Sequence, residues 1–246
     1  MLLATVMTIV LSISFKSVTE TQVTKLEEES QKALAAAESA IDVALKENSV
    51  NSSVTSFTLG SGSLSSITGF SGNATIQSTT STTFTTPNIP KDGSYTFYLG
   101  NYDVSSKIIN PVTDSNNLTL CFETGSTKPA IEVTLVKSDG VKKYVIDPDA
   151  RIISASTGSS CTPDPIKYSF STSILATDIG NNSQFLLVRV LYSSTKLLFS
   201  RATNLPIQGR TVSSQATSST STGVSKKVVL FQTYPQIPGE FFTTAF

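Results

Sequence analysis

The first 47 residues form a stretch that contains no helix-breaking residue. No Gly occurs before Gly60 and no Pro before Pro87. Because Gly and Pro are the residues that most often interrupt or end a helix, residues 1–47 are predicted to form one continuous helix. We therefore expect the rest of the chain to pack around this one long helix.

The two halves of the predicted helix differ in their apolar pattern. Residues 1–15, MLLATVMTIVLSISF, carry no charge and are apolar on all sides, which predicts burial in lipid or among other helices. In residues 16–48 apolar side chains recur at three- and four-residue steps, which predicts one buried face. That face would contain Val23, Leu26, Ala33, Leu34, Ala37, Ile41, Ala44 and Leu45. The helix is therefore predicted to be an anchor joined to a folded head.

The apolar segment is short for a membrane span. Its 15 residues give about 22 Å of helix, against a hydrocarbon core of roughly 30 Å. The basic flank that usually accompanies a membrane anchor does not precede it. Two interpretations remain open, a buried helix of a soluble protein and an anchor whose first residues are missing from this chain. We expect the second, because Ala-rich helices of this length rarely begin with so exposed an apolar end.

Strand patterns dominate the rest of the sequence. Residues 49–90 are rich in Ser and Thr and are predicted to be a long connection, and residues 91–246 are predicted to be an antiparallel β head domain. The clearest unit is residues 131–147, where two alternating runs flank Asp139-Gly140, a dipeptide that suits a type I′ hairpin turn. The other strands are predicted at 95–99, 118–122, 166–170, 185–192, 196–199 and 226–234, the last three buried on both faces. Residues 211–225 are predicted to be a Ser/Thr-rich loop. The fold class is therefore α+β, with the helix covering the apolar face of an antiparallel sheet.

Charge and cysteine content favour an exported protein. The chain has 18 basic and 18 acidic residues, so no nucleic-acid partner is expected. Charged residues make up 15% of the chain and Ser and Thr supply much of its polarity, a composition common in exported β-rich proteins. If the head is exported, Cys121 and Cys161 can form a disulfide; the alternative is two unrelated buried thiols.

No catalytic motif is recognisable. The chain contains no His, which removes Ser-His-Asp and Cys-His nucleophiles and the commonest metal ligand. Asp147-Pro-Asp149 and the segment from Asp178 to Asn182 could supply oxygens to calcium, but a turn needs the same residues. We therefore expect no enzyme activity, no cofactor, no metal and no small-molecule substrate.

Two segments resemble a known family. The apolar start MLLATVMTIVLSISF followed by KALAAAESAIDVAL, and the carboxyl end KKVVLFQTYPQIPGEFFTTAF, are similar to PilX-like pilus assembly proteins of the type IV pilin superfamily. The resemblance covers about 45 residues at the front and about 20 at the back. Most major pilins carry an acidic residue near the start of this helix, whereas here none precedes Glu20.

The resemblance implies a pilin-like structural subunit, most similar to a minor pilin, of a type IV pilus or related filament. Its partners would be the inner membrane before assembly and other pilin subunits afterwards, so that it ends in an extracellular filament and supports surface attachment. The side chains packed in the membrane and the filament core would be Leu2, Leu3, Val6, Ile9, Val10 and Ile13. Two alternatives remain open: a membrane-anchored adhesin or binding module, and a pseudopilin of a type II-like secretion system.

Overall fold

The chain folds into one long helix and a series of antiparallel strands, divided between two compact units. Unit 1 consists of residues 1–77 and 211–232, and unit 2 of residues 78–210 and 233–246. The structure, a computed structural model, describes residues 2–50, 55–78, 80–123, 125, 127–220 and 223–238, without the side chains of residues 2–6, 8–13 and 48–50.

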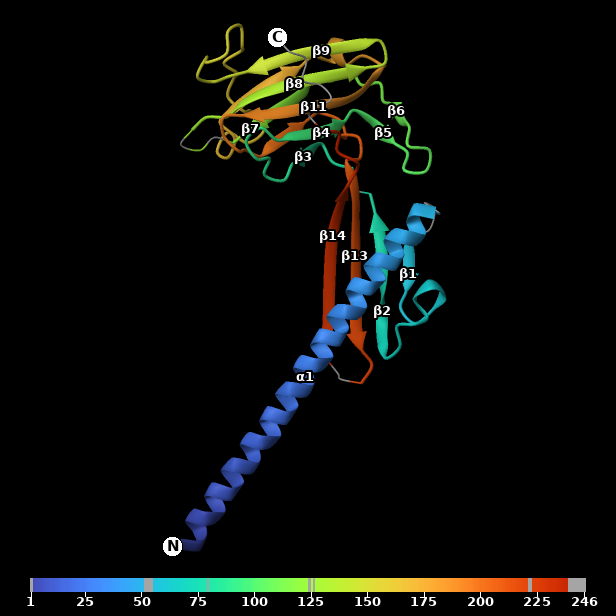
Figure 1. The fold of residues 1–246 in the computed structure, drawn as a ribbon, viewed down its shortest axis with the longest axis vertical. Helices are drawn as coiled ribbons and strands as arrows, with labels where there is room; N and C mark the ends of the chain where they lie inside the picture. The colour runs from blue at the N-terminus through green and yellow to red at the C-terminus, as the bar shows by residue number, and fades with distance from the viewer. Residues whose placement is uncertain are drawn as a thin grey trace. The chain divides into compact units, whose positions relative to one another are not determined.

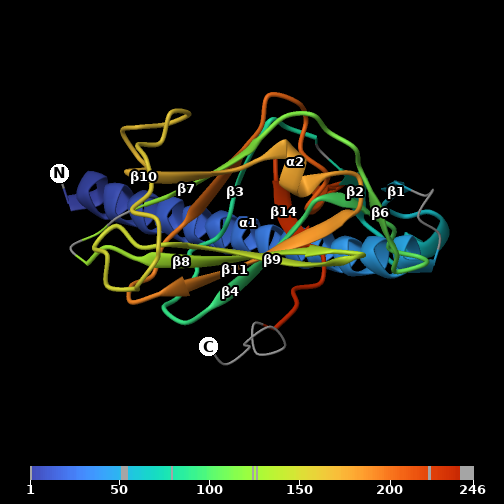
Figure 2. The same cartoon turned by 90° about the horizontal axis from the view of Figure 1, so that it is seen from above.

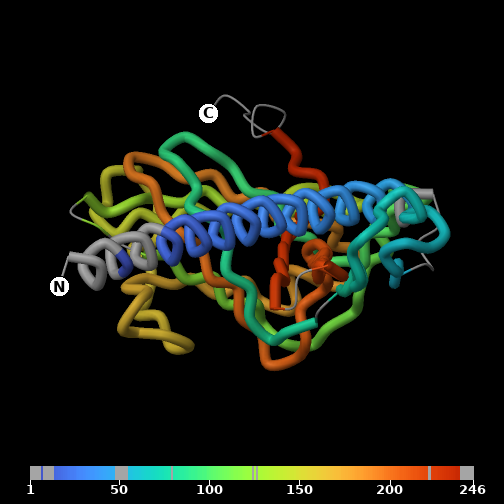
Figure 3. The backbone as a smooth tube through the Cα atoms, turned by 90° about the horizontal axis from the view of Figure 1, so that it is seen from below, coloured from blue at the N-terminus to red at the C-terminus, as the bar shows by residue number. Residues whose placement is uncertain are grey.

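Unit 1 is a helix laid on a four-stranded sheet. Helix α1 (Leu2–Val50) is continuous, as predicted, and between residues 14 and 47 its trace shows no break (Figure 3). The sheet has the strand order β1-β2-β13-β14, and α1 crosses one face of it (Figure 1). Its strands are β1 (Ser56–Thr58), β2 (Phe70–Gln77), β13 (Gly209–Ser218) and β14 (Ser225–Thr233), with the short 3-10 helix η1 (Gly62–Leu64) between β1 and β2.

The buried face of α1 is made almost entirely of alanine. Its members recur at helical spacing: Ala33, Ala36, Ala37, Ala40, Ile41 and Ala44 are all buried. They pack on Phe57, Ala74, Ile76, Val212 and Ala216 of the sheet. The prediction of a buried stripe is confirmed from Ala33 onward but is wrong for Val23, Leu26 and Leu34, which are 40–48% exposed. Leu34 projects about 100° around the helix from Ala33, beside the buried face, and stays exposed.

Strand β13 contradicts the predicted Ser/Thr loop at 211–225. Residues 211–218 pair with β2 in an antiparallel ladder, with Thr211 opposite Gln77 and Ser218 opposite Phe70. Alternate residues of β13 point toward α1, and there Ser214 and Ser218 are buried beside Val212 and Ala216. Small polar residues fit this face because the opposing helix presents mainly alanine, so the strand has few large apolar residues.

The ladder between β2 and β13 also depends on one glycine. A Cβ atom added to Gly72 would lie 2.0 Å from the backbone oxygen of Gln215, and φ at Gly72 is +143°. Only glycine allows the two backbones to approach this closely.

Unit 2 consists of two four-stranded sheets that pack face to face. One has the order β10-β7-β12-β3 and the other β4-β11-β8-β9, in which β8, β9 and β11 lie side by side (Figure 2). The strands are β3 (Thr83–Thr85), β4 (Ser94–Tyr98), β7 (Leu118–Phe122), β8 (Ala130–Lys137), β9 (Gly140–Ile146), β10 (Phe170–Ile174), β11 (Ser183–Leu191) and β12 (Leu197–Ser200). A two-stranded sheet, β5 (Gly100–Tyr102) and β6 (Ile109–Pro111), and a helical turn, α2 (Ala176–Ile179), complete it.

The core of unit 2 lies between its two sheets. Phe97 of β4 stacks on Phe199 of β12 with ring centroids 3.9 Å apart, and buried aliphatic side chains from both sheets surround this pair. The sheets of unit 2 therefore cover each other, whereas the predicted helical cover is found on the sheet of unit 1. An α+β class with mainly antiparallel strands is confirmed.

Most predicted strands are present, with three corrections. The hairpin at 131–147 is confirmed as β8 and β9, but Lys137 pairs with Gly140, so the two turn residues are Ser138 and Asp139. The strand predicted at 166–170 begins only at Phe170. The strand at 226–234 is present as β14 but is mostly exposed rather than buried on both faces, because it is the edge strand of its sheet.

Candidate functional site

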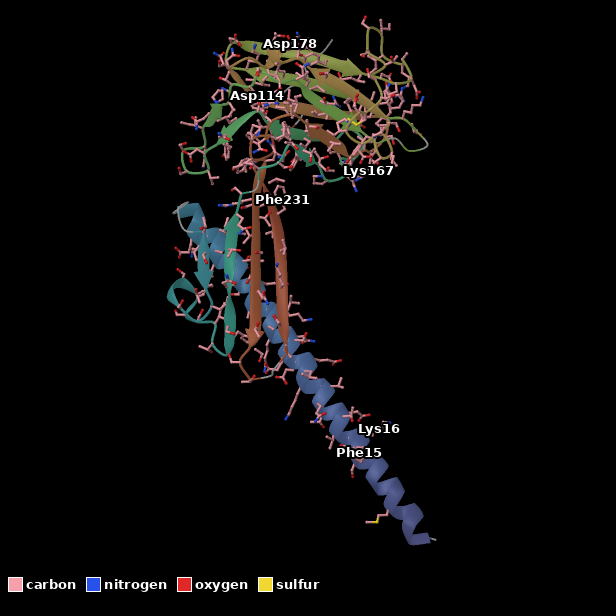
Figure 4. The ribbon with its side chains drawn as sticks, turned by 180° about the vertical axis from the view of Figure 1, so that it is seen from behind. Phe15, Lys16, Asp114, Lys167, Asp178 and Phe231 are labelled. Carbon is pink, nitrogen blue, oxygen red and sulfur yellow. A yellow bond between two sulfur atoms is a disulfide. The ribbon has the colours of Figure 1, made fainter. Side chains whose placement is uncertain are left out.

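From Ser14 to Glu28, helix α1 is covered by no other described part of the chain. Every side chain from Ser14 to Glu28 is exposed, including Phe15 (68%) and Val18 (55%). Phe15 and Lys16 project from this part of the helix, away from the strands of unit 1 (Figure 4). Phe15 and Val18 are therefore two large apolar side chains exposed close together on this part of the helix.

The residues predicted to pack in the membrane and the filament core lie nearer the amino end of α1. Their backbone is helical, but the side chains of Leu2, Leu3, Val6, Ile9, Val10 and Ile13 lie outside the described residues. The neighbouring Met7 side chain is described, and it is 64% exposed. Among the residues that the structure describes, no helix has an apolar stretch long enough to cross a membrane.

Glu29 marks the point where the sheet begins to cover α1. Its Oε2 atom accepts hydrogen bonds from the hydroxyls of Ser218 (2.7 Å) and Thr220 (3.2 Å), at the end of β13. Lys32, one turn away, lies 3.8 Å from its other carboxylate oxygen. The hydrogen bond from Ser218 is the main cause that lowers the pKa of Glu29. Nothing in the sequence around Glu29 indicates this contact, because its partner Ser218 lies about 190 residues away along the chain.

The predicted disulfide is present in unit 2. Cys121 of β7 and Cys161 are bonded, with their Cα atoms 5.7 Å apart, and both are buried together with Tyr168 and Leu198. The bond attaches the loop before β10 to the centre of its sheet. It therefore supports the fold of unit 2 rather than forming an exposed reactive centre.

The carboxylates considered for calcium already have cationic or amide partners. Asp147, whose side chain is fully buried, accepts hydrogen bonds from the backbone N–H groups of Arg151 (2.6 Å) and Ile152 (3.0 Å) and from the Arg151 guanidinium (2.7 Å). Asp149 pairs with Lys128 at 2.7 Å. Asp178 accepts from Lys142 (2.5 Å) and from the Tyr144 hydroxyl (2.7 Å). In the described part of the chain, no three acidic or thiol side chains are grouped as a metal site would require.

A pocket of about 520 Å³ opens on unit 2 beside the Asp147 turn. Its lining is mainly aliphatic and contains two charged side chains: Glu132, Val145, Arg151, Ile152, Ile153 and Leu191. Both charges are engaged, Glu132 with Lys143 at 3.2 Å and Arg151 with Asp147 and with the ring of Tyr192, 3.9 Å from the guanidinium carbon to the ring centroid. The pocket therefore presents an apolar surface without a nucleophile or an acid–base pair.

Residues 235–237, which follow β14, are held against strand β4 by hydrogen bonds that involve side chains. The backbone N–H of Thr96 donates to Gln236 Oε1 (2.8 Å), and the N–H of Ile237 donates to Thr96 Oγ1 (2.9 Å). The hydroxyl of Tyr98 donates to the carbonyl of Pro235 (2.6 Å). Burial, with the nearby Tyr102 and Tyr234, raises the pKa of Tyr98 to about 12.

The sequence matches no protein-family model and no curated protein.

Proposed function

We propose that this protein is a non-catalytic structural subunit of a type IV pilus or a related filament, similar to PilX-like minor pilins. The proposal is carried by one observation: α1 is continuous over 49 residues, yet the first of its described side chains to be buried is Ala33. A helix that is packed on its own sheet at one end and uncovered at the other requires a second environment for the uncovered end.

The chemistry of the uncovered end favours lipid and then neighbouring helices. Residues 1–15 contain no charge, and the first Lys and Glu are Lys16 and Glu20. Hydrocarbon and protein interiors are similarly apolar, so such a segment can exchange one for the other at little cost. In this proposal residues 1–15 lie first in the inner membrane and later pack against other subunits, so they meet an apolar environment at both stages.

The remaining features agree with a non-catalytic role outside the cytoplasm. The chain has no His, and the described acids considered as metal ligands are neutralised by Lys or Arg. A disulfide within the head is typical of an oxidising compartment.

The proposal is tested by placing a charge in the apolar segment. Val10→Asp should abolish membrane retention, because an Asp at the centre of a membrane helix costs roughly 3 kcal/mol and the segment is already short. Val23→Asp makes the same change on the exposed part of α1 and should leave retention unchanged. Cell fractionation with antibody detection measures both, and circular dichroism of each variant checks that the fold is kept.

A second measurement separates a filament subunit from an anchored adhesin. Filaments sheared from cells should contain the wild-type chain and lack the Val10→Asp variant. Wild-type chain that stays wholly with the membrane after shearing would contradict the filament proposal while leaving the anchor intact.

A further inference from the structure

The pocket beside the Asp147 turn is held in shape by the backbone around it. Asp147 accepts hydrogen bonds from three backbone N–H groups of the turn that forms one wall. Ala150, Ser154 and Tyr192, each next in sequence to a lining residue, have φ angles of +51°, +66° and +69°. Positive φ is uncommon outside glycine and is concentrated at functional sites. The pocket is therefore a formed feature of unit 2 that can receive a ligand.

Arg189 of β11 provides a cation on the same face of the sheet as the pocket. Its neighbours Val188 and Val190 point into the core, so the half-buried Arg189 side chain lies on the outer face. It is directly opposite Glu132, a lining residue whose carboxylate is bound by Lys143 at 3.2 Å. Among the described residues, no hydrogen bond or ion pair reaches the Arg189 guanidinium. A guanidinium in this position favours a carboxylate as its partner.

The pocket and Arg189 together select a ligand with a carboxylate next to a large apolar group. The lining is mainly aliphatic, and its volume of about 520 Å³ lies within the range of small-molecule and side-chain sites. The chain contains such a sequence in residues 239–246, GEFFTTAF, where Glu240 directly precedes Phe241 and Phe242. These residues lie outside the described part of the structure, so the argument for their position comes from the residues before them.

The last hydrogen-bonded residues of the described chain lead toward Arg189. The carbonyl of Pro235 is bound by Tyr98, and two residues later the N–H of Ile237 donates to Thr96 Oγ1. The chain therefore runs toward the amino end of β4, where the next residue on that face is directly opposite Arg189. Strand β4 is the neighbour of β11 in this sheet (Figure 2).

The distances across the sheet match the spacing of the acid and the aromatic residues. Neighbouring strands lie about 4.8 Å apart, and each residue rises about 3.3 Å along its strand. In the observed register, Arg189 is roughly 8 Å from Thr96, and Val145 of the pocket is roughly 16 Å from it. Glu240 and Phe242 follow the residue bound at Thr96 by three and five positions, which an extended chain spans in about 10 Å and 16 Å.

We propose that residues 239–246 cross the outer face of this sheet, with Glu240 bound to Arg189 and Phe242 in the pocket. The hydrogen bonds at Thr96 hold the segment nearby, which raises its effective concentration at the pocket above that of a separate ligand. The pocket is then closed by the chain itself. A partner that offers an aromatic residue next to a carboxylate has to displace this segment before it can bind.

A pair of thiols tests the position of the segment in the full-length chain. The two native cysteines are bonded to each other, so Val145→Cys with Phe242→Cys adds two free thiols. Mild oxidation in detergent solution should join them within one chain, which mass spectrometry of the digested protein detects as a linked peptide. Val141→Cys with Phe242→Cys is the matched control. Val141 is 57% exposed on the same face of β9 and equally far from Thr96, but in the opposite direction, and it should remain mostly unlinked.

A charge reversal tests the contact between Glu240 and Arg189. In the Val145→Cys/Phe242→Cys chain, Arg189→Glu should slow disulfide formation about ten-fold or more, because two carboxylates then face each other. Adding Glu240→Arg should restore the rate, because the pair is reversed rather than removed. Lys25→Glu makes the same change of charge on the exposed part of α1 and should leave the rate unchanged.

Three results would overturn the proposal. The first is equal linking of Phe242→Cys to Val145→Cys and to Val141→Cys, and the second is an unchanged rate in Arg189→Glu. The third is a disulfide that forms only between two chains, which would assign the pocket to the carboxyl-terminal segment of a second copy.

Discussion

Asp147 is a buried carboxylate whose charge is compensated within five residues of chain. Burial raises its pKa, but the hydrogen bonds from Arg151 and from the backbone N–H groups of Asp149, Ile152 and Arg151 outweigh burial, so its pKa is lowered. A group with a lowered folded-state pKa stabilises the fold above its unfolded pKa and loses that contribution as the pH falls. The unfolded pKa of Asp is about 3.9.

The stability of unit 2 should accordingly decrease as the pH drops below about 4. In Asp147→Asn this part of the pH dependence should be absent, and at neutral pH the variant should be less stable by about 3 kcal/mol, because the Arg151 guanidinium loses its buried partner. Urea unfolding at a series of pH values measures both effects. Asp139→Asn, in the exposed hairpin turn, provides the control and should follow the wild-type curve. Equal pH dependence in Asp147→Asn and wild type would refute this role.

At the scale of elements, the contact between α1 and its sheet depends on small side chains. Ala37 has no exposed surface, so Ala37→Leu must displace the strands beneath it and should cost about 1–3 kcal/mol. Ala35→Leu adds the same atoms to the exposed side of the helix and should leave stability within about 0.5 kcal/mol. Thermal unfolding followed by circular dichroism compares the two. A similar melting temperature for both variants would mean that the helix does not pack closely here.

The β2–β13 ladder offers a second test at this scale. Gly72→Ala would force its Cβ against the Gln215 carbonyl, so the two strands would have to separate. We expect amide hydrogen exchange in β13 to accelerate strongly in this variant while β8 and β9 of unit 2 stay protected. Unchanged exchange in β13 would show that the ladder can absorb the added methyl group.

The elements that could be predicted from the sequence are those specified locally. An uninterrupted run without Gly or Pro predicted α1, and alternating apolar residues around Asp139-Gly140 predicted the β8–β9 hairpin. β13 could not be predicted, because its buried positions include Ser214 and Ser218 and their burial depends on the alanine face of a helix far away in sequence. The apolar run of β14 was interpreted as a core strand, since composition does not distinguish a central strand from an exposed edge.

The candidate site, the uncovered part of α1, was likewise predictable only in part. The change from an all-apolar to a one-sided pattern along α1 predicted that the helix would be only partly covered. The position where cover begins, Ala33 with Glu29 just before it, depends on Ser218 and Thr220 of a distant strand. A pattern of single residues carries no information about such long-range hydrogen bonds.

At the scale of the whole molecule, the disulfide should stabilise one unit selectively. In the chain-entropy account, closing a loop across a separation of 40 residues contributes about 4 kcal/mol. Cys121→Ser with Cys161→Ser should therefore make unit 2 the first region cut by a protease, while the packed part of α1 and β13 keeps its resistance. Limited proteolysis with mass spectrometry locates the cuts. First cleavage within β2 or β13 would contradict this assignment.

The order of the strands in unit 1 determines when its folding can finish. β2 and β13 are neighbours in space, yet all of residues 78–210 are synthesised between them. While the chain emerges, the alanine face of α1 has only β1 and β2 to rest on, and unit 2 can fold before the second pair of strands exists. The sheet under α1 is thus completed only at the last stage of biosynthesis, so the buried face of the helix stays partly uncovered until β13 and β14 have been synthesised.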